Sequence, residues 1–373
     1  MRLVLHREIP ENEDLRRQWN ELVLRMESPE VFYTYEWALA VSRGYKGSME
    51  PLLVLGYEQE SLVGVAAFAI DEERQRASFL AGNTADYCDF VSDPSRRLEF
   101  VNLVLREPQP LAPNLTLPNL PASSATAWAL KDTSMQQGWA HFSRPAFQCA
   151  QVDLASCSQK ESVKRAMHSK QMVRRHVKAM ARTGRVEVQH LTDWCEVSEA
   201  LPAFRDAHLQ RFCSLGRRSN LASPQRWGFL RELARLLASQ GWMTLSRLTI
   251  SGRPIAWAYG FKFGGSWFYY QPTFDIRFRS YYPGFCLLAR IVEDACDQPE
   301  IQRVDLGLGD EGYKSRFATD HRETVHITLN SSVISHIREE LRYHTASALK
   351  SVPPLERCVR RLLGKTVAGG ARA

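Results

Sequence analysis

The sequence lacks any run of apolar residues long enough to span a bilayer, so it predicts no transmembrane helix. The first 19 residues also lack the apolar core and the small-residue cleavage site of a secretory signal, and we therefore expect a cytoplasmic protein. Hydrophobic residues make up 44% of the 373 residues and charged residues 24%, which excludes extensive disorder and supplies enough apolar side chains for two domain cores.

Cysteine is present but never at the spacing of metal ligands. The eight cysteines form no C-x-x-C pair, which argues against a structural zinc site and predicts reduced thiols. Cys88 has no histidine near it in the sequence, so a covalent cysteine nucleophile is not expected. The G-x-x-x-x-G-K-[ST] spacing of a P-loop is absent as well. We therefore expect chemistry that needs neither a metal nor a covalent enzyme intermediate.

Positive charge is concentrated in two segments. The net charge is +7, but residues 160–185 carry a local +8 and residues 335–373 a local +5, which leaves the remainder at about −6. Basic segments of this kind suit an anionic partner, such as a nucleotide cofactor, RNA or an anionic membrane face.

Apolar periodicity divides the chain into two similar halves. In each half, helices precede a hairpin of two apolar strands, a third strand, a loop and another helix. The clearest helices are expected at 15–26, 162–183, 195–213 and 224–239, and the hairpins at 51–58 with 62–70 and 243–250 with 255–263. This order predicts a duplicated α/β unit.

The expected organisation has four parts. Residues 1–155 and 185–333 form the two α/β domains, a basic linker helix at 156–184 joins them, and a basic helical tail follows at 334–373. Apolar residues in the tail, between 355 and 363, lie among arginines and form a small amphipathic stripe that suits an anionic membrane or a partner protein.

Four stretches carry a resemblance to a known family. They are FYTYEW at 32–37, the hairpin with the downstream loop NTADYCDF, the basic SKQMVRRHVKAMARTG at 169–184, and YYPGFCLLARIVEDA followed by VDLGLGDEGYKSRFA. Together they resemble the CelD/BcsL-type acetyltransferases, a branch of the GNAT superfamily grouped with BioF2-like and FemAB-like proteins. The resemblance covers about residues 15–330, and it departs at Tyr282, where the family usually has a small serine before the proline.

The resemblance implies an α/β (α+β) fold of two tandem GNAT-like domains, each with a mixed, mainly antiparallel sheet flanked by helices. It also implies acyl-CoA as the co-substrate and direct transfer of its acyl group to an amine or hydroxyl acceptor. By analogy alone, the acceptor belongs to cell-envelope or exopolysaccharide biosynthesis.

The Pro283-Gly284 turn is the candidate donor site. A loop that leads into a helix N-terminus offers backbone N–H groups to a phosphate, and GNAT folds bind the CoA pyrophosphate at the equivalent junction. We therefore expect Gly284 and Phe285, helped by Arg277 and Arg279, to hold the diphosphate. On the preceding strand, Gln271 is expected to line the acyl pocket. The alternative is a turn that only redirects the chain.

The segment after the buried strand at 304–309 is the candidate catalytic site. Polar side chains often form sites at the carboxyl end of such a strand. Asp310 or Glu311 is expected to deprotonate the acceptor, Tyr313 to protonate the leaving thiolate, and Lys314 to pair with an anion. The alternative is a solvated surface turn with a lysine–aspartate pair.

Five further side chains are candidates for binding the acceptor. Asp86, Tyr87 and Asp89 lie in one polar loop, Asp305 ends a strand, and His208 lies on a helix with Arg211. Carboxylates with an aromatic neighbour suit a sugar or an amine. The alternatives are an Asx-rich turn for the loop and a structural role for the histidine.

Two other functions remain open at this point. A FemAB-like enzyme would take its donor from aminoacyl-tRNA, which makes tRNA the one nucleic-acid partner we consider. A scaffold of a polysaccharide-synthesis complex would need no catalysis and would use the basic tail as an anchor, in peripheral contact with the inner membrane. The acceptor itself is expected to be a small molecule or a glycan.

Overall fold

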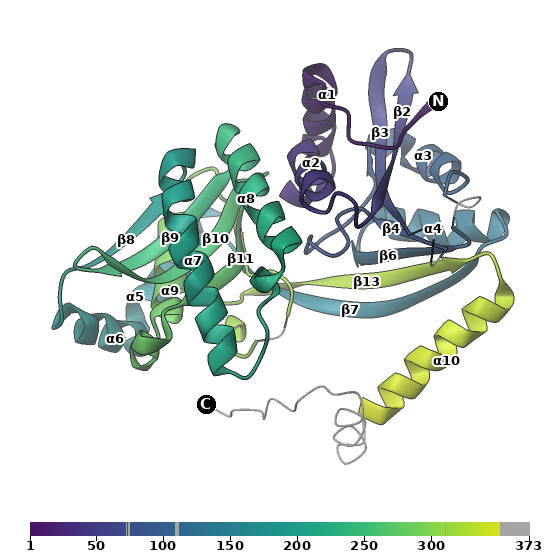
Figure 1. The fold of residues 1–373 in the computed structure, drawn as a ribbon. Coiled ribbons are helices and arrows are strands. Elements are labelled where there is room, and N and C mark those ends of the chain that lie inside the picture. Colours follow the sequence, from purple (N-terminus) through teal and green to yellow (C-terminus); the bar gives the residue numbers. More distant parts are fainter. Residues whose placement is uncertain (72, 74, 109–111, 310, 351–373) are drawn as a thin grey trace.

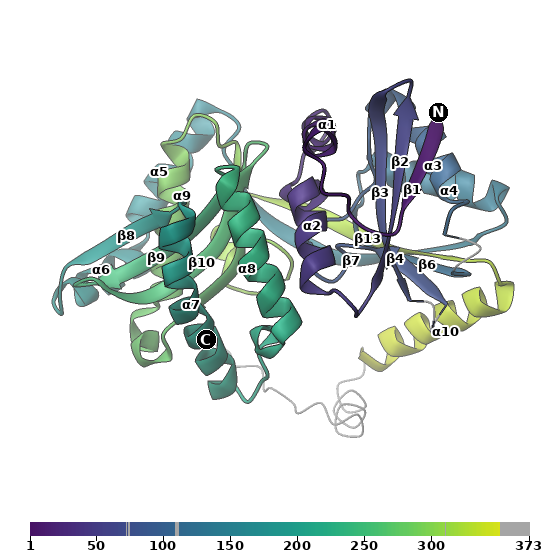
Figure 2. The same cartoon turned by 45° about the horizontal axis from the view of Figure 1, so that its top comes forward.

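The computed structural model describes residues 1–71, 73, 75–108, 112–309 and 311–350, and Figure 1 shows their arrangement. The strands form one long sheet in the order β1-β2-β3-β4-β6-β13-β7-β12-β11-β10-β9-β8, with β5 paired to β3. Helices cover this sheet in two groups, one over each half of the chain (Figures 1 and 2).

The N half contains the first part of the sheet and four helices. Its elements are β1 (Arg2–His6), α1 (Glu13–Leu24), α2 (Tyr35–Gly44), β2 (Glu50–Glu58), β3 (Ser61–Asp71), β4 (Arg76–Phe79), β5 (Val91–Ser92), α3 (Arg97–Val104), β6 (Asn114–Pro121) and α4 (Ala125–Gln136). The long loop between β4 and α3 carries NTADYCDF.

The C half repeats the same order. Its elements are β8 (Val186–Leu191), α7 (Trp194–Ser214), α8 (Pro224–Ser239), β9 (Met243–Ile250), β10 (Arg253–Phe263), β11 (Ser266–Phe274), the 3-10 helix η4 (Ile276–Tyr281), α9 (Pro283–Cys296) and β12 (Arg303–Asp305). In both halves, two helices precede three antiparallel strands, which are followed by a further helix and a last strand. This last strand pairs parallel with the third of the three strands: β6 with β4 in the N half, and β12 with β11 in the C half. The expected duplicated fold, with mixed and mainly antiparallel strands, is confirmed.

Two long strands exchange between the halves. Strand β7 (Ala140–Asp153) follows the N half in the chain but pairs with β12, whereas β13 (Asp320–Asn330) follows the C half but pairs with β6. The two also pair with each other, and both run from one half to the other in Figure 1. The halves therefore share one sheet, and β13 is an element that the sequence analysis did not predict.

Close packing of α2 against α8 also fixes the position of the N half relative to the C half. A Cβ on Gly44 would lie 2.7 Å from the Phe229 backbone, so only glycine permits this approach. The Trp37 ring packs edge-on to Phe229 of α8 and to Phe261 of β10. Because side chains of both halves share one core here, a cleft between them has fixed walls.

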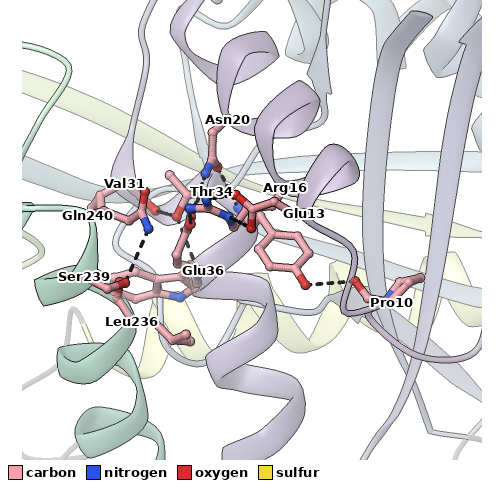
Figure 3. Close-up of polar contacts among 12 residues, drawn as sticks. Pro10, Glu13, Arg16, Asn20, Val31, Thr34, Glu36, Leu236, Ser239 and Gln240 are labelled. Carbon is pink, nitrogen blue, oxygen red and sulfur yellow. Dashed lines mark hydrogen bonds and ion pairs between the residues drawn. The ribbon is translucent and has the colours of Figure 1, made fainter. Parts of the chain in front are cut away.

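The FYTYEW motif builds this junction (Figure 3). Thr34 caps α2, accepting from the Trp37 N–H at 3.3 Å, and the buried Glu36 carboxylate accepts from Asn20 of α1 at 2.9 Å. The indole Nε1 of Trp37 donates to Thr84 Oγ1 at 3.0 Å. The motif thus anchors the loop that carries Asp86.

The basic segment that the sequence predicts as one helix at 162–183 is two helices. Helix α5 (Cys157–Ser169) ends and α6 (Gln171–Ala181) begins at Lys170, whose backbone is extended. Lys170 Nζ donates to the Arg316 carbonyl at 2.8 Å and lies 5.1 Å from the Phe317 ring centre. These distant contacts explain the break, and local periodicity did not reveal them. The proposed domain boundaries remain a prediction.

Within the described ranges, no helix is both long and apolar enough to cross a membrane. The tail stripe at 355–363 lies outside the described residues.

Candidate functional site

A cleft opens where β11 and β12 diverge. The two strands pair only from Ser266 to Phe268, and β11 continues to Phe274 with β10 as its neighbour. β11 bulges at this point, because Tyr259 pairs with Gln271 and Phe261 with Phe268. A Cβ on Gly260 would lie 2.2 Å from the Phe268 carbonyl oxygen, so the bulge requires this glycine. The first cleft, of about 810 Å³, lies beside the unpaired edge of β11.

The N-terminus of α9 faces this first cleft. Gly284 and Phe285 line it, as the sequence predicts. The Phe285 N–H donates to the Tyr282 carbonyl at 3.1 Å, but the Gly284 N–H finds no acceptor among the described residues. Tyr282 has φ 49° and ψ 48°, a left-handed conformation that turns the chain into the helix despite the side chain. One free amide and the positive end of the helix dipole therefore favour an anion here.

Arginines surround the same cleft. Arg279, Arg316 and Arg211 line it, and none forms an ion pair with a carboxylate of the described residues. Arg277 does not reach the cleft, because its guanidinium binds the Asp275 carboxylate at 2.6 Å and is otherwise exposed. The structure thus gathers Gly284, Phe285 and Arg279 but not Arg277.

A second cleft, of about 660 Å³, lies between the halves. Its walls come from the β4–α3 loop of the N half and from α7, α8 and β11 of the C half. Arg211, Pro272 and Tyr313 line both clefts. The two clefts therefore meet at these three residues.

Asp86 is the acidic side chain that the N half contributes to the second cleft. Its Oδ2 lies 2.5 Å from where a Cβ on Gly307 would stand, and its carboxylate accepts from the Leu308 N–H. The pKa of Asp86 is raised to about 7, mainly by burial and next by the nearby Asp305 carboxylate, while Lys314 and Arg226 act in the opposite direction. A carboxyl with this pKa gives and takes protons near neutral pH.

Tyr87 and Asp305 hold this loop in place. The Tyr87 hydroxyl donates to Asp305 Oδ2 at 2.8 Å, and Gln151 of β7 donates to the same oxygen at 2.6 Å. The Gly307 N–H donates to Asp305 Oδ1 at 2.8 Å. From the sequence, Tyr87 and Asp305 are expected to bind the acceptor, but both are fully buried and line neither cleft. They position Asp86 instead.

Asp89 lies away from both clefts. Its Oδ2 accepts from Ser124 Oγ at 2.5 Å and lies 3.8 Å from the buried Arg97 guanidinium. The side chain is 5% exposed, so this aspartate belongs to the interior of the N half rather than to an acceptor site.

The candidate catalytic residues after β12 have different surroundings and therefore different roles. Tyr313 stands where the clefts meet, and burial together with the nearby Glu311 raises the pKa of its phenol, which keeps it protonated. Lys314 is 5% exposed and donates to the Leu308 carbonyl at 2.6 Å and to Glu311 Oε2 at 2.8 Å. Lys314 therefore fixes the loop around Gly307, and Glu311 lines the second cleft. Asp310 lies outside the described residues.

His208 and Gln271 form a buried pair. His208 Nε2 accepts from Gln271 Nε2 at 3.0 Å, and its Nδ1 contacts Ser219 Oγ at 2.8 Å. Burial and the nearby Arg211 and Arg226 lower the pKa of His208 to about 4, so the ring is neutral. With Nε2 occupied, the histidine orients Gln271. Gln271 lines the second cleft and not the donor cleft that the sequence predicts.

Arg226 of α8 is a cleft residue that the sequence analysis missed. Its Nη2 donates to the Tyr270 hydroxyl at 2.6 Å, and that hydroxyl in turn donates to the Thr84 carbonyl. No carboxylate of the described residues pairs with Arg226. Arginines on amphipathic helices are usually surface residues, so no local sequence pattern identifies Arg226 as part of a cleft.

Residues 167–315 match the family model described as an acetyltransferase (GNAT) domain. This part of the chain is therefore similar to GNAT acetyltransferase domains. It includes β11, α9 and β12, which frame the first cleft. A search of curated proteins found no significant match.

Solved structures share the fold of the whole chain and not only of the GNAT domain. The structure titled FemX is 10% identical, with 88% of this chain and 97% of that chain covered and a TM-score of 0.62. The C-terminal domain of a putative lysylphosphatidylglycerol synthetase from Agrobacterium fabrum is 13% identical, with 90% and 96% covered and a TM-score of 0.53. L-PGS from Bacillus licheniformis is 12% identical, with 83% and 94% covered and a TM-score of 0.50.

At these identities the likeness shows the fold alone. The family match bears out the GNAT resemblance seen in the sequence, and the structure titled FemX shares the fold that a FemAB-like protein would have. Over the described part of the chain, no group of three or more His, Cys, Asp or Glu side chains is arranged to hold a metal ion.

Proposed function

We propose that the protein transfers an acyl group from acyl-CoA to an amine or hydroxyl acceptor. The observation that carries this proposal is the meeting of the two clefts at Tyr313, Arg211 and Pro272. The donor lies in the first cleft, with its diphosphate at the N-terminus of α9. The acceptor lies in the second cleft, beside Asp86. Holding both reactants in adjoining clefts makes the reaction effectively unimolecular.

Transfer in this arrangement is a direct displacement. The acceptor N–H or O–H loses its proton to the Asp86 carboxylate as its nitrogen or oxygen bonds to the thioester carbon. Amides on the edge of β11 beyond Phe268, which β12 does not pair, stabilise the oxyanion. The C–S bond then breaks, and the CoA thiolate takes a proton from the Tyr313 phenol. Solvent afterwards exchanges protons with both groups.

Titration calorimetry with acetyl-CoA, a long-chain acyl-CoA and CoA tests the donor assignment. We expect micromolar binding to at least one of them, and loss of that binding in Gly284→Glu, because a carboxylate then occupies the anion site. Gly284→Ala is the matched control, since the added Cβ would meet only Phe274, at 3.6 Å. Absence of binding to all three ligands would reject acyl-CoA as the donor.

Tyr313→Phe tests the proton donor. We expect kcat to fall roughly 10- to 100-fold with an unchanged dissociation constant for acyl-CoA, because the leaving thiolate loses its acid. An aryl thioester, whose thiolate needs no proton, should react at nearly the wild-type rate. If the aryl donor is slowed as much as acyl-CoA, the tyrosine has another role.

A second donor is favoured by one observation. Helix α6 carries Arg174, Arg175 and Lys178, and its Met172 lines the donor cleft, so a basic surface borders that cleft. Aminoacyl-tRNA is the alternative donor that such a surface suits. A steep salt dependence of tRNA binding, with no binding of acyl-CoA, would establish it. An envelope or exopolysaccharide acceptor remains part of the proposal, to be tested by assay against such glycans.

A further inference from the structure

A third cavity lies far from the two clefts. It is a groove of about 740 Å³ between α10 (Val333–Lys350) and the sheet formed by β4, β6, β13 and β7. Four arginines line it: Arg76, Arg144, Arg338 and Arg342. None of them forms an ion pair with a carboxylate of the described residues. We call this cavity the arginine groove.

The other side chains of the arginine groove do not neutralise these charges. Among the described residues, Glu339 is the one carboxylate that lines the groove, and it accepts from Thr328 Oγ1 of β13 at 3.4 Å. Arg144 lies 5.5 Å from the ring centre of Tyr343, a contact that leaves its N–H groups free for an acceptor. The arginine groove therefore suits an anionic ligand with oxygen acceptors.

A buried amide independently points to an acceptor ligand. Asn330, at the end of β13, is 1% exposed and lines the arginine groove. Its Nδ2 donates no hydrogen bond among the described residues. An unsatisfied buried donor costs about 1–3 kcal/mol. A phosphate in the groove supplies acceptors both for this amide and for the arginine guanidinium groups, which bind phosphate in a bidentate manner.

The outward face of α10 is apolar. Val333, Ile334, Ile337 and Leu341 recur at helical spacing and are between 49% and 72% exposed. The groove-lining Ser335, Arg338, Glu339, Arg342 and Tyr343 follow the same spacing on the opposite face. The helix thus turns its charged face to the protein and its apolar face to solvent, along the edge of the molecule (Figure 1).

We propose that α10 docks the protein on an anionic bilayer, with a lipid phosphate in the arginine groove and the apolar face of α10 at the acyl boundary. A helix with one apolar face and an opposite face that carries cations has the pattern of helices that lie in the membrane interface. Unpaired arginines also favour an anionic surface over a second copy of this chain, which brings the same positive charge. This docking is independent of the transfer reaction.

Vesicle co-sedimentation of the full chain tests the proposal. We expect binding to phosphatidylcholine vesicles that contain about 30% phosphatidylglycerol and little binding to pure phosphatidylcholine. Arg338→Gln with Arg342→Gln should weaken binding on the order of 20-fold. Ile334→Ser with Ile337→Ser should weaken it about tenfold or more. These side chains are exposed, so the variants are expected to fold.

The matched control is Arg17→Gln with Arg25→Gln, which removes the same charge from exposed positions at α1, away from α10 in both views (Figures 1 and 2). It should bind vesicles like the wild type. The proposal is overturned if neither α10 pair weakens binding or if the control weakens it equally. It is also overturned if inorganic phosphate binds but vesicles do not, or if the serine pair instead dissolves a dimer in sedimentation velocity.

Discussion

Asp86→Asn is expected to lower kcat by roughly 10²- to 10⁴-fold, the usual contribution of a general base. In the wild type, kcat/KM should rise with pH through about 7, because only the ionised carboxylate accepts the proton of the acceptor. The variant should lose this rise. Asp93→Asn removes a carboxylate from the same β4–α3 loop, at a partly exposed cap that lines neither cleft, and should change neither the rate nor the profile. A variant that keeps its activity and its pH dependence would reject the base.

Asp86→Asn is also expected to be more stable than the wild type at alkaline pH. The folded pKa of Asp86, about 7, lies above the value of 3.8 for an unperturbed aspartate, so the folded state binds this proton more tightly than the unfolded state. Its contribution to stability is fully present below about pH 4 and is lost as the pH rises through 7. Asparagine avoids that loss and should stabilise the protein by up to about 4 kcal/mol at pH 8 and hardly at all near pH 4. Urea unfolding at the two pH values measures the difference, and an equal effect at both would contradict the raised pKa.

Gly307→Ala is expected to separate donor binding from catalysis. The added Cβ would lie 2.5 Å from Asp86 Oδ2, and the glycine has φ +71°, so alanine both displaces the carboxylate and strains the backbone. We expect kcat to fall roughly 100-fold, because small displacements of a reacting group are costly. The free energy of unfolding should fall by about 1–3 kcal/mol. Acyl-CoA binding should persist, since Gly307 does not line the first cleft.

Gly252→Ala is the control for backbone strain. Gly252 has φ +80°, but no atom lies within 4 Å of its added Cβ. It should therefore lose a little stability and no activity. If both variants lose activity alike, strain and not contact with Asp86 is responsible; if neither does, the loop around Gly307 does not position the base.

Local patterns predicted the elements that depend on local sequence. The helix expected at 224–239 is α8, and the hairpin expected at 243–250 and 255–263 is β9 with β10. Strand β13 was missed because DHRETVHITLN shows little apolar alternation at its start, and its partners β6 and β7 lie far away in the chain. The break at Lys170 was missed for a similar reason, since its cause is a contact with Arg316.

In the candidate site, too, the sequence predicted what depends on neighbouring residues and not what depends on distant contacts. Gly284, Phe285 and Arg279 come together because one strand, loop and helix carry them. Asp86 reaches the second cleft from the other half, and its pKa is raised by burial and then by Asp305, neither of which any spacing predicts. Tyr87 resembles a ligand residue in the sequence, but as a buried polar group it is satisfied by Asp305. His208 does line the second cleft, where its ring nitrogens contact Gln271 and Ser219.

The exchange of β7 and β13 also governs how the chain is made. Strand β6 is complete early in translation, yet its neighbour β13 leaves the ribosome only after the whole C half has been synthesised. The nascent N half therefore exposes an open strand edge during this interval, and such edges invite aggregation. Pairing across so long a separation also raises the contact order and slows folding. Until β13 is synthesised, β6 therefore has one edge without its native partner.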